Sequence, residues 1–377
     1  MVKSDILVVG GGPAGLAAAI AIRQKGLAVT LVDAAKPPID KACGEGLMPD
    51  GVEALKKLGV RLDPLQSARF RGIRFIDGCT AASAEFPASY GIGLRRTTLH
   101  SLLAERAAEA GVRLLWNTCV RELDVTQARW IVGADGRNSR VREWAGFGKC
   151  AARVQRFGFR RHFPVAPWSD TVDVHWGGGC QIYVTPVNAN EVCVAVVSRH
   201  QTLRLDEALR GFPEVERRLT GCVPATCERG SVTECRKLRR VVRGNVILAG
   251  DASGSVDAVT GEGLALSFQQ ALALADAIEA DDLASYEAAH RRIARMPALM
   301  GNLMLLMDRR AWVRRRVIRA LAAESGLFSK LLAMHVGAMP AREFGFGGVC
   351  TLGWELLAAN GRPGSEVGIN GPQVFRG

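Results

Sequence analysis

The chain has 377 residues, of which 48% are hydrophobic and 23% charged, close to the averages of globular proteins. This length predicts about two domains with a large core and excludes small scaffolds that depend on disulfides or metals. No apolar run reaches the roughly 18 residues expected of a membrane-spanning helix. The formal net charge of +12 favours an anionic partner, which could be a nucleic acid, a membrane surface, an acidic carrier protein or a phosphate-bearing ligand.

The ten cysteines are scattered, with no Cys-x-x-Cys pair and no histidine pair at zinc-binding spacing. This pattern predicts a reducing compartment and no metal site. The first residues lead directly into an apolar strand without a basic and apolar leader, so we expect no export. Together these features predict a cytoplasmic protein.

Residues 5–33 predict a strand, a glycine-rich turn, an Ala-rich helix and a second strand. The turn reads Gly10-Gly11-Gly12-Pro13-Ala14-Gly15, and Asp33 ends the second strand. Glycines at this spacing let the backbone and the helix N-terminus approach a pyrophosphate, and the acid accepts hydrogen bonds from a ribose. The segment therefore predicts a dinucleotide-binding site.

The chain continues with a loop rich in glycine and proline around Cys43 and Gly44, short strands over 68–95, and a helix from Arg96 to about residue 110. A buried strand ends at Asp135. Four extended segments between 154 and 198, separated by Pro, Gly and Asn turns, predict a mostly antiparallel sheet. The dinucleotide pattern returns at 245–251, which makes the first domain discontinuous.

Three separated motifs together resemble the FAD-binding signatures of the p-hydroxybenzoate-hydroxylase-like flavoproteins, the group A flavin monooxygenases. They are residues 10–15 with Asp33, residues 132–142, and residues 247–252 with 260–263. Within that superfamily, residues 43–47 and 256–263 are most similar to the geranylgeranyl-reductase branch. The resemblance covers roughly residues 3–290.

The fold that this resemblance implies is an α/β protein with a three-layer FAD-binding domain around a parallel sheet, an inserted antiparallel substrate sheet and a helical C-terminal cap. The expected FAD-binding domain comprises residues 1–68, 96–150 and 240–283. The expected substrate domain comprises residues 69–95 and 151–239. A helical region over 284–340 and an extended tail over 341–377 complete the prediction.

The resemblance implies noncovalent FAD and assigns roles to matching residues. Arg96 would contact the cofactor, Asp251 would lie near its ribityl and pyrophosphate region, and the helix after Gly263 would direct its N-terminus at the reduced flavin ring. The predicted cofactor-binding residues are Gly10, Gly12, Pro13, Ala14, Gly15, Asp33, Cys43, Gly44, Arg96, Asp135, Gly250, Asp251, Gly261, Glu262 and Gly263. The neighbouring Arg95 is expected to be a solvated base.

No catalytic residue is assigned by the sequence. The candidates are Cys43, in the loop expected near the flavin, and three titratable residues of the substrate sheet, namely His162, His175 and Tyr183. Each has a structural alternative: Cys43 could be a small apolar filler, and histidines on exposed strands are more often not catalytic. Because no second Gly-x-Gly-x-x-Gly occurs, NAD(P)H is expected to visit only transiently as the reductant.

Two chemistries fit this scaffold. The first expectation is an NAD(P)H-dependent monooxygenase that hydroxylates or epoxidises an apolar or aromatic small molecule, plausible in secondary metabolism. The alternative is reduction of isoprenoid C=C bonds, as in geranylgeranyl reductases. A third alternative is a flavin-bound docking protein without turnover.

The excess positive charge is concentrated between Arg291 and Arg319, where nine arginines and one acid, Asp308, alternate with methionine, leucine and valine. This pattern predicts either a solvated helix face packed on the core or a surface for an anionic membrane or an acidic carrier protein. Nucleic acid is disfavoured because no aromatic stacking platform accompanies the arginines. The substrate is expected to be a hydrophobic small molecule, and a peripheral position at the membrane stays open.

Overall fold

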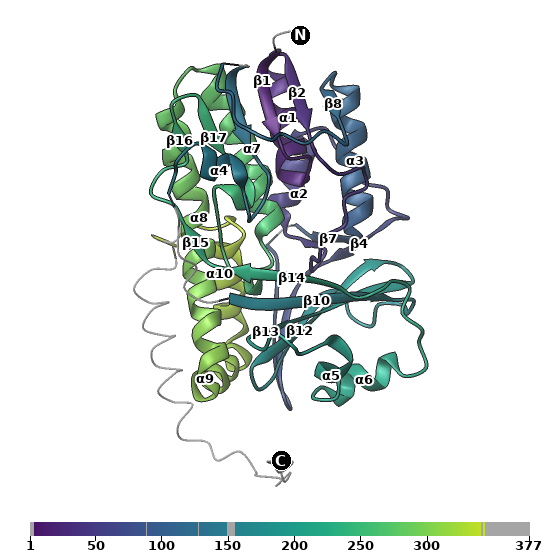
Figure 1. Ribbon diagram of the computed structural model, residues 1–377. Helices are drawn as coiled ribbons and strands as arrows, with labels where there is room; N and C mark the ends of the chain where they lie inside the picture. The colour runs from purple at the N-terminus through teal and green to yellow at the C-terminus, as the bar shows by residue number, and fades with distance from the viewer. Residues whose placement is uncertain (1–3, 88, 127, 149–154, 341, 344–377) are drawn as a thin grey trace, which may run out of the picture.

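The computed structural model describes residues 4–87, 89–126, 128–148, 155–340 and 342–343. The upper half of the molecule is built on a six-stranded sheet with the order β16-β17-β9-β1-β2-β8 (Figure 1). Its strands are β1 (Ser4–Val9), β2 (Val29–Val32), β8 (Arg113–Leu115), β9 (Ala128–Gly133), β16 (Val242–Arg243) and β17 (Val246–Leu248). Only β16 runs antiparallel to its neighbour, so this is the predicted parallel sheet.

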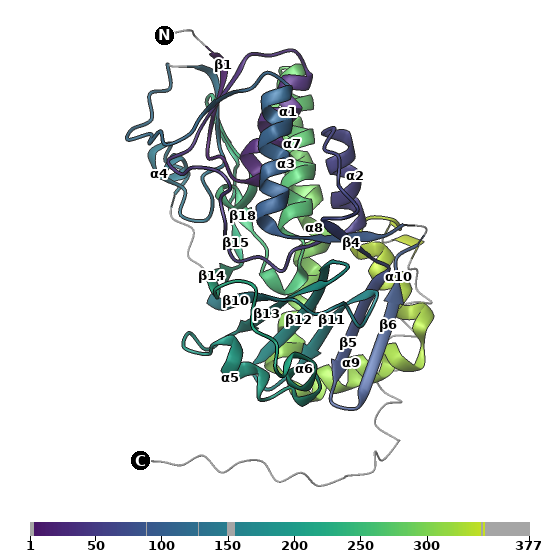
Figure 2. The same cartoon turned by 90° about the vertical axis from the view of Figure 1, so that its right-hand side faces the viewer.

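Helices bury their apolar faces against this sheet and against one another. They are α1 (Pro13–Gln24), α3 (Arg96–Glu109) and α7 (Gly263–Glu279), and α2 (Pro49–Lys57) packs on α7. Figure 2 shows α1, α3 and α7 side by side along one face. Alanine-rich α1 is buried along most of its length, which lets α7 pack closely against it.

The lower half is a seven-stranded sheet with the order β14-β10-β13-β12-β11-β5-β6. Its strands are β5 (Gly72–Asp77), β6 (Thr80–Glu85), β10 (Gln155–Phe163), β11 (Thr171–Trp176), β12 (Cys180–Asn188), β13 (Glu191–Ser198) and β14 (Arg229–Glu234). Every pair is antiparallel except β5 with β11, so the predicted antiparallel sheet is present with one parallel junction.

Smaller elements connect the two halves. A three-stranded sheet joins β3 (Gly46–Leu47), β7 (Gly91–Leu94) and β4 (Ser67–Phe70), and β15 (Arg236–Lys237) pairs with β18 (Gly254–Ser255). The short helices are α4 (Arg140–Trp144), α5 (Leu205–Leu209) and α6 (Pro213–Leu219), with 3₁₀ turns at Gly250–Ala252 and Ala258–Thr260. The β3 strand brings the predicted flavin loop into contact with the lower sheet.

Three C-terminal helices pack along one side of the molecule: α8 (Leu283–Arg309), α9 (Ala311–Ala323) and α10 (Ser325–His335). The Asp282 carboxylate caps α8 by accepting hydrogen bonds from the backbone N–H groups of Ala284 and Ser285. Residues of α9 and α10 share a buried cluster with β5, β6 and β11. No helix in the described part of the chain combines the length and the hydropathy needed to cross a bilayer. Of the expected 341–377 tail, all but 342–343 lies outside the described residues.

The helical cap corrects one prediction about the basic segment. Arg314 is buried, and its Nε donates to the Asp77 carboxylate at 3.0 Å while a second nitrogen reaches the Gly177 carbonyl. Asp308 is buried as well and accepts a hydrogen bond from Gln181. Both side chains therefore tie the cap to the lower sheet, whereas the periodicity of the sequence placed Arg314 among the surface charges.

Candidate functional site

A cavity of about 1340 Å³ lies between the two sheets and extends to the C-terminal helices. Its upper wall is formed where β1, β2 and β9 end, which is where open α/β sheets bind ligands. The predicted cofactor residues that line it are Gly10, Gly12, Pro13, Ala14, Asp33, Cys43, Gly44, Arg96, Asp135, Asp251, Gly261 and Gly263. Gly15, Gly250 and Glu262 are not part of its lining.

The glycines of the first turn have two different roles. A Cβ on Gly10 would lie 2.4 Å from the Ala134 carbonyl oxygen, and one on Gly15 would lie 1.8 Å from the Gly10 oxygen. These two residues therefore allow the turn to pack on itself and on the end of β9. A Cβ on Gly12 would meet no atom within 4 Å, although Gly12 lines the cavity. Gly12 thus leaves room for a ligand at the N-terminus of α1.

Two acidic side chains at this wall are held rigidly by backbone N–H groups. The Asp33 carboxylate accepts from Gly11 N at 2.6 Å and from Ala35 N at 2.7 Å. One oxygen of Asp135 accepts from the first turn of α4, while its other oxygen is buried without a partner among the described residues. Asp33 is therefore oriented for a ribose hydroxyl, and Asp135 offers a free acceptor at the cavity.

Arg96 supplies positive charge to the same wall. It is the first residue of α3, its Nε is buried without a partner in the described part of the chain, and it lines the cavity. Arg95 instead forms a two-pronged ion pair with the buried Glu191, so the expectation of a solvated base is wrong. A pyrophosphate dianion needs positive charge, N–H donors and space for close approach. Arg96, the N-terminus of α1 and Gly12 provide these in turn, so the site fits FAD.

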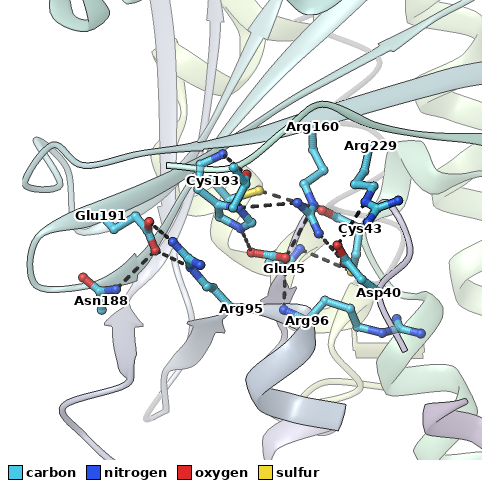
Figure 3. Close-up of polar contacts among 12 residues, drawn as sticks. Asp40, Cys43, Glu45, Arg95, Arg96, Arg160, Asn188, Glu191, Cys193 and Arg229 are labelled. Atoms are coloured by element: carbon cyan, nitrogen blue, oxygen red, sulfur yellow. Dashed lines mark hydrogen bonds and ion pairs between the residues drawn. The ribbon is translucent and has the colours of Figure 1, made fainter. Parts of the chain in front are cut away.

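Glu45 anchors the 40–47 loop to the lower sheet and was missed by the sequence analysis (Figure 3). It is 1% exposed, has a left-handed backbone with φ of 61°, and accepts a hydrogen bond from Arg96 N at 3.0 Å. Its other oxygen lies 2.5 Å from His162 Nε2, and Arg160 Nε is 3.6 Å from the carboxylate. Arg160 also pairs with Asp40. The network therefore fixes the loop between α3 and β10.

His162 is a positioning residue in this network. Its Nδ1 contacts the Thr226 hydroxyl at 2.9 Å and its Nε2 contacts Glu45, and the ring is not part of the cavity lining. Glu45, His162 and Cys193 could together surround a cation, since their donor atoms lie within 4.8 Å of one another. Arg160 already provides positive charge to Glu45 and contacts His162 Nδ1, so a metal ion would be repelled there.

The other three catalytic candidates lie in different surroundings. Cys43 lines the cavity, and its sulfur accepts a weak hydrogen bond from Glu45 N. Tyr183 also lines it, but its hydroxyl donates to the Val259 carbonyl at 2.9 Å and burial raises its pKa. His175 lies outside the cavity lining, packs against Phe212, and has a pKa lowered by burial. Of the four, the geometry brings Cys43 and Tyr183 to the cavity.

The lower part of the cavity is an apolar chamber. Strands of the seven-stranded sheet form one wall, and α8, α9 and α10 form the other. The side chains that these three helices contribute are Met300, Leu303, Met304, Met307, Val317, Leu321, Phe328, Leu331, Leu332 and His335. All are apolar except His335. Met300, Leu303 and Met307, which lie between the arginines of the basic segment, thus face the chamber.

His335 and Glu262 meet where the chamber joins the upper wall, and His335 had no sequence signal. His335 Nε2 is 3.4 Å from a Glu262 oxygen, and His335 Nδ1 is buried without a partner among the described residues. Burial lowers the pKa of His335 to about 4, although the Thr260 backbone opposes this change. Burial, and to a smaller extent Asp50, raises the pKa of Glu262 well above its usual value. Both shifts in pKa favour the uncharged forms, a protonated carboxyl group and a neutral imidazole.

Comparison with known proteins decides the family. The family described as "FAD binding domain" matches residues 3–205, which is more than half of the chain. The chain belongs to this FAD-binding family. The flavoprotein is also similar to a menaquinone reductase of Mycobacterium tuberculosis, with 26% identity over 75% of this chain and 78% of that protein.

Two further relatives point to different chemistries. A digeranylgeranylglycerophospholipid reductase of Methanothermobacter thermautotrophicus is 26% identical over 69% of this flavoprotein and 73% of its own length. A 6-methylpretetramide 4-monooxygenase of Streptomyces rimosus is 29% identical over 72% and 74%. The two names confirm the predicted resemblance to the group A flavin monooxygenases and, within that superfamily, to the geranylgeranyl reductases. The flavoprotein is an FAD-dependent enzyme, and the expectation of a docking protein without turnover is not supported.

The fold prediction is confirmed by a solved structure. A flavoprotein/dehydrogenase from Cytophaga hutchinsonii superposes with a TM-score of 0.79, at 17% identity, over 94% of this chain and 99% of the other. At this identity the likeness concerns the fold alone. It agrees with the parallel sheet, the inserted second sheet and the helical C-terminal region described above.

Proposed function

We propose that this flavoprotein reduces a carbon–carbon double bond in an apolar, chain-like substrate, with NAD(P)H as the transient electron source. The observation that carries the proposal is the chamber, whose helical wall is apolar except for His335. A hydrocarbon chain binds such a wall by burial alone, without polar anchors. The similarity of residues 43–47 to the geranylgeranyl-reductase branch and the digeranylgeranylglycerophospholipid reductase relative support the same chemistry. The menaquinone reductase relative supports a reduction, without naming the bond.

Reduction of an isolated double bond places a hydride on one carbon and a proton on the other. FAD supplies the hydride when it is bound and reduced. The chain binds the cofactor pyrophosphate at Gly12 and the N-terminus of α1, accepts from the ribose with Asp33, and adds positive charge through Arg96. The Glu45 network keeps the 40–47 loop in place at the junction between cofactor and chamber.

The proton would come from the His335–Glu262 pair. His335 Nδ1 donates a proton to the substrate carbon while Nε2 accepts the proton that Glu262 carries, so the imidazole stays neutral. This leaves a Glu262 carboxylate at the N-cap of α7, where the positive end of the helix dipole stabilises it. Solvent returns the proton after product release. His335 is thus the proposed acid, and Glu262 acts through it.

Monooxygenation is the second candidate, and the monooxygenase relative favours it. Hydroxylation of a phenolic ring is easier when a protein group orients or deprotonates the substrate hydroxyl. In the described chamber the Tyr183 hydroxyl is already committed to Val259 O. An apolar alkene epoxidised at the flavin would still fit, so the dependence on oxygen separates the two candidates.

The proposed function is tested by product analysis. The FAD-loaded protein is supplied with NADPH or NADH and with geranylgeranyl lipids, menaquinone or polycyclic aromatic substrates. We expect a product that has gained two hydrogens per double bond from an isoprenoid substrate. A product that has gained one oxygen atom, formed only from the aromatic substrates, would overturn the proposal.

A further inference from the structure

Three large apolar side chains are exposed on the outside of the helical cap. Leu299 is 57% exposed, Leu306 is 46% exposed and Trp312 is 61% exposed. Leu299 and Leu306 are two turns apart on α8, so they lie on one face of that helix. Trp312 follows at the start of α9, one residue after its first. Large apolar side chains that stay exposed among charged neighbours mark contact surfaces.

The charge around these side chains is of one sign. Of the nine arginines between Arg291 and Arg319, Arg314 is buried and Arg316 is half-buried, so seven are exposed. The single acid of this segment, Asp308, is buried and contacts Gln181 and Arg199. The exposed face of α8 and α9 over residues 291–319, which we name the α8–α9 surface, therefore combines positive charge with leucine and tryptophan.

The α8–α9 surface and the chamber share the same two helices. Met300, Leu303 and Met307 of α8 and Val317 of α9 line the chamber on the inner face. The seven exposed arginines, Leu306 and Trp312 occupy the outer face. Figure 1 shows both helices along one side of the lower sheet, so one helical layer separates the chamber from the outside.

We infer that the α8–α9 surface docks on an anionic lipid bilayer. Interfacial helices that lie on membranes carry arginine on one part of their exposed face and insert leucine and tryptophan beside it. An acidic carrier protein would also satisfy the charges and could pack on the tryptophan, so it is an alternative outcome of the test. The bilayer is favoured because the same two helices form the wall of the apolar chamber. Docking there would bring the bilayer against the wall of the apolar chamber. The inference holds whether the enzyme reduces or oxygenates its substrate.

Vesicle binding of the FAD-loaded full chain tests the inference. We expect binding to vesicles of equal phosphatidylglycerol and phosphatidylcholine at 0.1 M salt and little binding to pure phosphatidylcholine. Raising salt to 1 M shortens the Debye length from about 10 Å to about 3 Å and should release the protein. Arg315→Gln with Arg319→Gln should weaken partitioning roughly 25-fold, since one arginine near an anionic surface contributes about fivefold. Leu306→Glu and Trp312→Glu should weaken it as well.

Matched controls separate docking from general charge or folding effects. Arg113→Gln with Arg121→Gln removes the same charge at β8 and just after it, in the upper half, and Leu65→Glu changes a side chain that is 87% exposed elsewhere. Both controls should bind as the parent does, and every variant should keep its FAD and its thermal transition. The inference is overturned if the parent ignores anionic vesicles, if the surface variants bind normally, if the controls lose binding equally, or if the parent binds acidic carrier protein instead.

Discussion

Replacing Gly12 by valine should strongly weaken FAD binding while the protein stays folded. Gly12 has φ of −69° and ψ of 175°, a conformation open to any residue, and its Cβ would meet no atom within 4 Å. We therefore expect the free energy of unfolding of the apoprotein to change by less than about 1 kcal/mol. The new side chain would instead occupy the space in front of the α1 N-terminus, where the pyrophosphate must approach the backbone.

The loss in affinity follows from the contacts removed. Two hydrogen bonds from backbone N–H groups to a charged phosphate contribute about 1.5–3 kcal/mol each, so the dissociation constant should rise at least about 100-fold. Quenching of flavin fluorescence during titration of the apoprotein measures this change. Gly178→Val is the control, because that glycine is also open to solvent and lies outside the cavity lining. A variant at Gly12 that binds FAD within a few fold of the parent would refute the assignment of the site.

Three further outcomes are expected. Arg156→Met should lower the free energy of unfolding by about 3–5 kcal/mol, because it leaves the buried Asp257 carboxylate without its cation and leaves Asp308 with Arg199 alone. A change below about 1 kcal/mol in denaturant titration would contradict this. Glu262→Gln should lower the rate of flavin oxidation in a single turnover about 10²–10⁴-fold, with little change in FAD affinity. A loss of FAD binding instead would mean that Glu262 contacts the cofactor. Burial lowers the pKa of His290 to about 4, so between pH 6.5 and pH 4 the imidazole takes up a proton only in the unfolded chain. Between pH 7 and pH 4 the free energy of unfolding of the parent should therefore fall by up to about 3 kcal/mol more than that of His290→Asn. Equal losses in the two proteins would contradict this.

The cofactor side of the site was predictable because its determinants are local in sequence. The glycine turn, the adjoining helix and Asp33 lie within one βαβ unit, where strand order and helix direction follow from spacing. The later motifs around Asp135 and Asp251 follow strands of the same parallel sheet, so their ends meet at the same edge. Periodicity also located the helices of the cap and the strands of the lower sheet.

The remaining part of the site depends on contacts between distant segments. Glu45 and His162 meet across 117 positions, and neither residue carries a local signal for the other. Glu45 could have been found by asking why a charged residue stands between two glycines in a loop next to the cofactor. His335 reaches Glu262 only because α10 folds back onto the upper wall. Arg314 is buried because the basic segment is not one continuous helix: α8 ends at Arg309 and α9 begins at Ala311. A helical period carried across Arg310 therefore predicts the wrong face for Arg314.

We propose that the reduced enzyme delivers hydride to a carbon–carbon double bond without oxygen. An anaerobic single-turnover measurement tests it most directly: the FAD of the purified protein is reduced with one equivalent of NADPH or dithionite, an isoprenoid lipid is added, and flavin absorbance and product mass are followed. We expect the lipid to reoxidise the flavin and the product to carry two added hydrogens, with both steps slowed in His335→Asn. A flavin that stays reduced until air is admitted, followed by a product with one added oxygen atom, would contradict it.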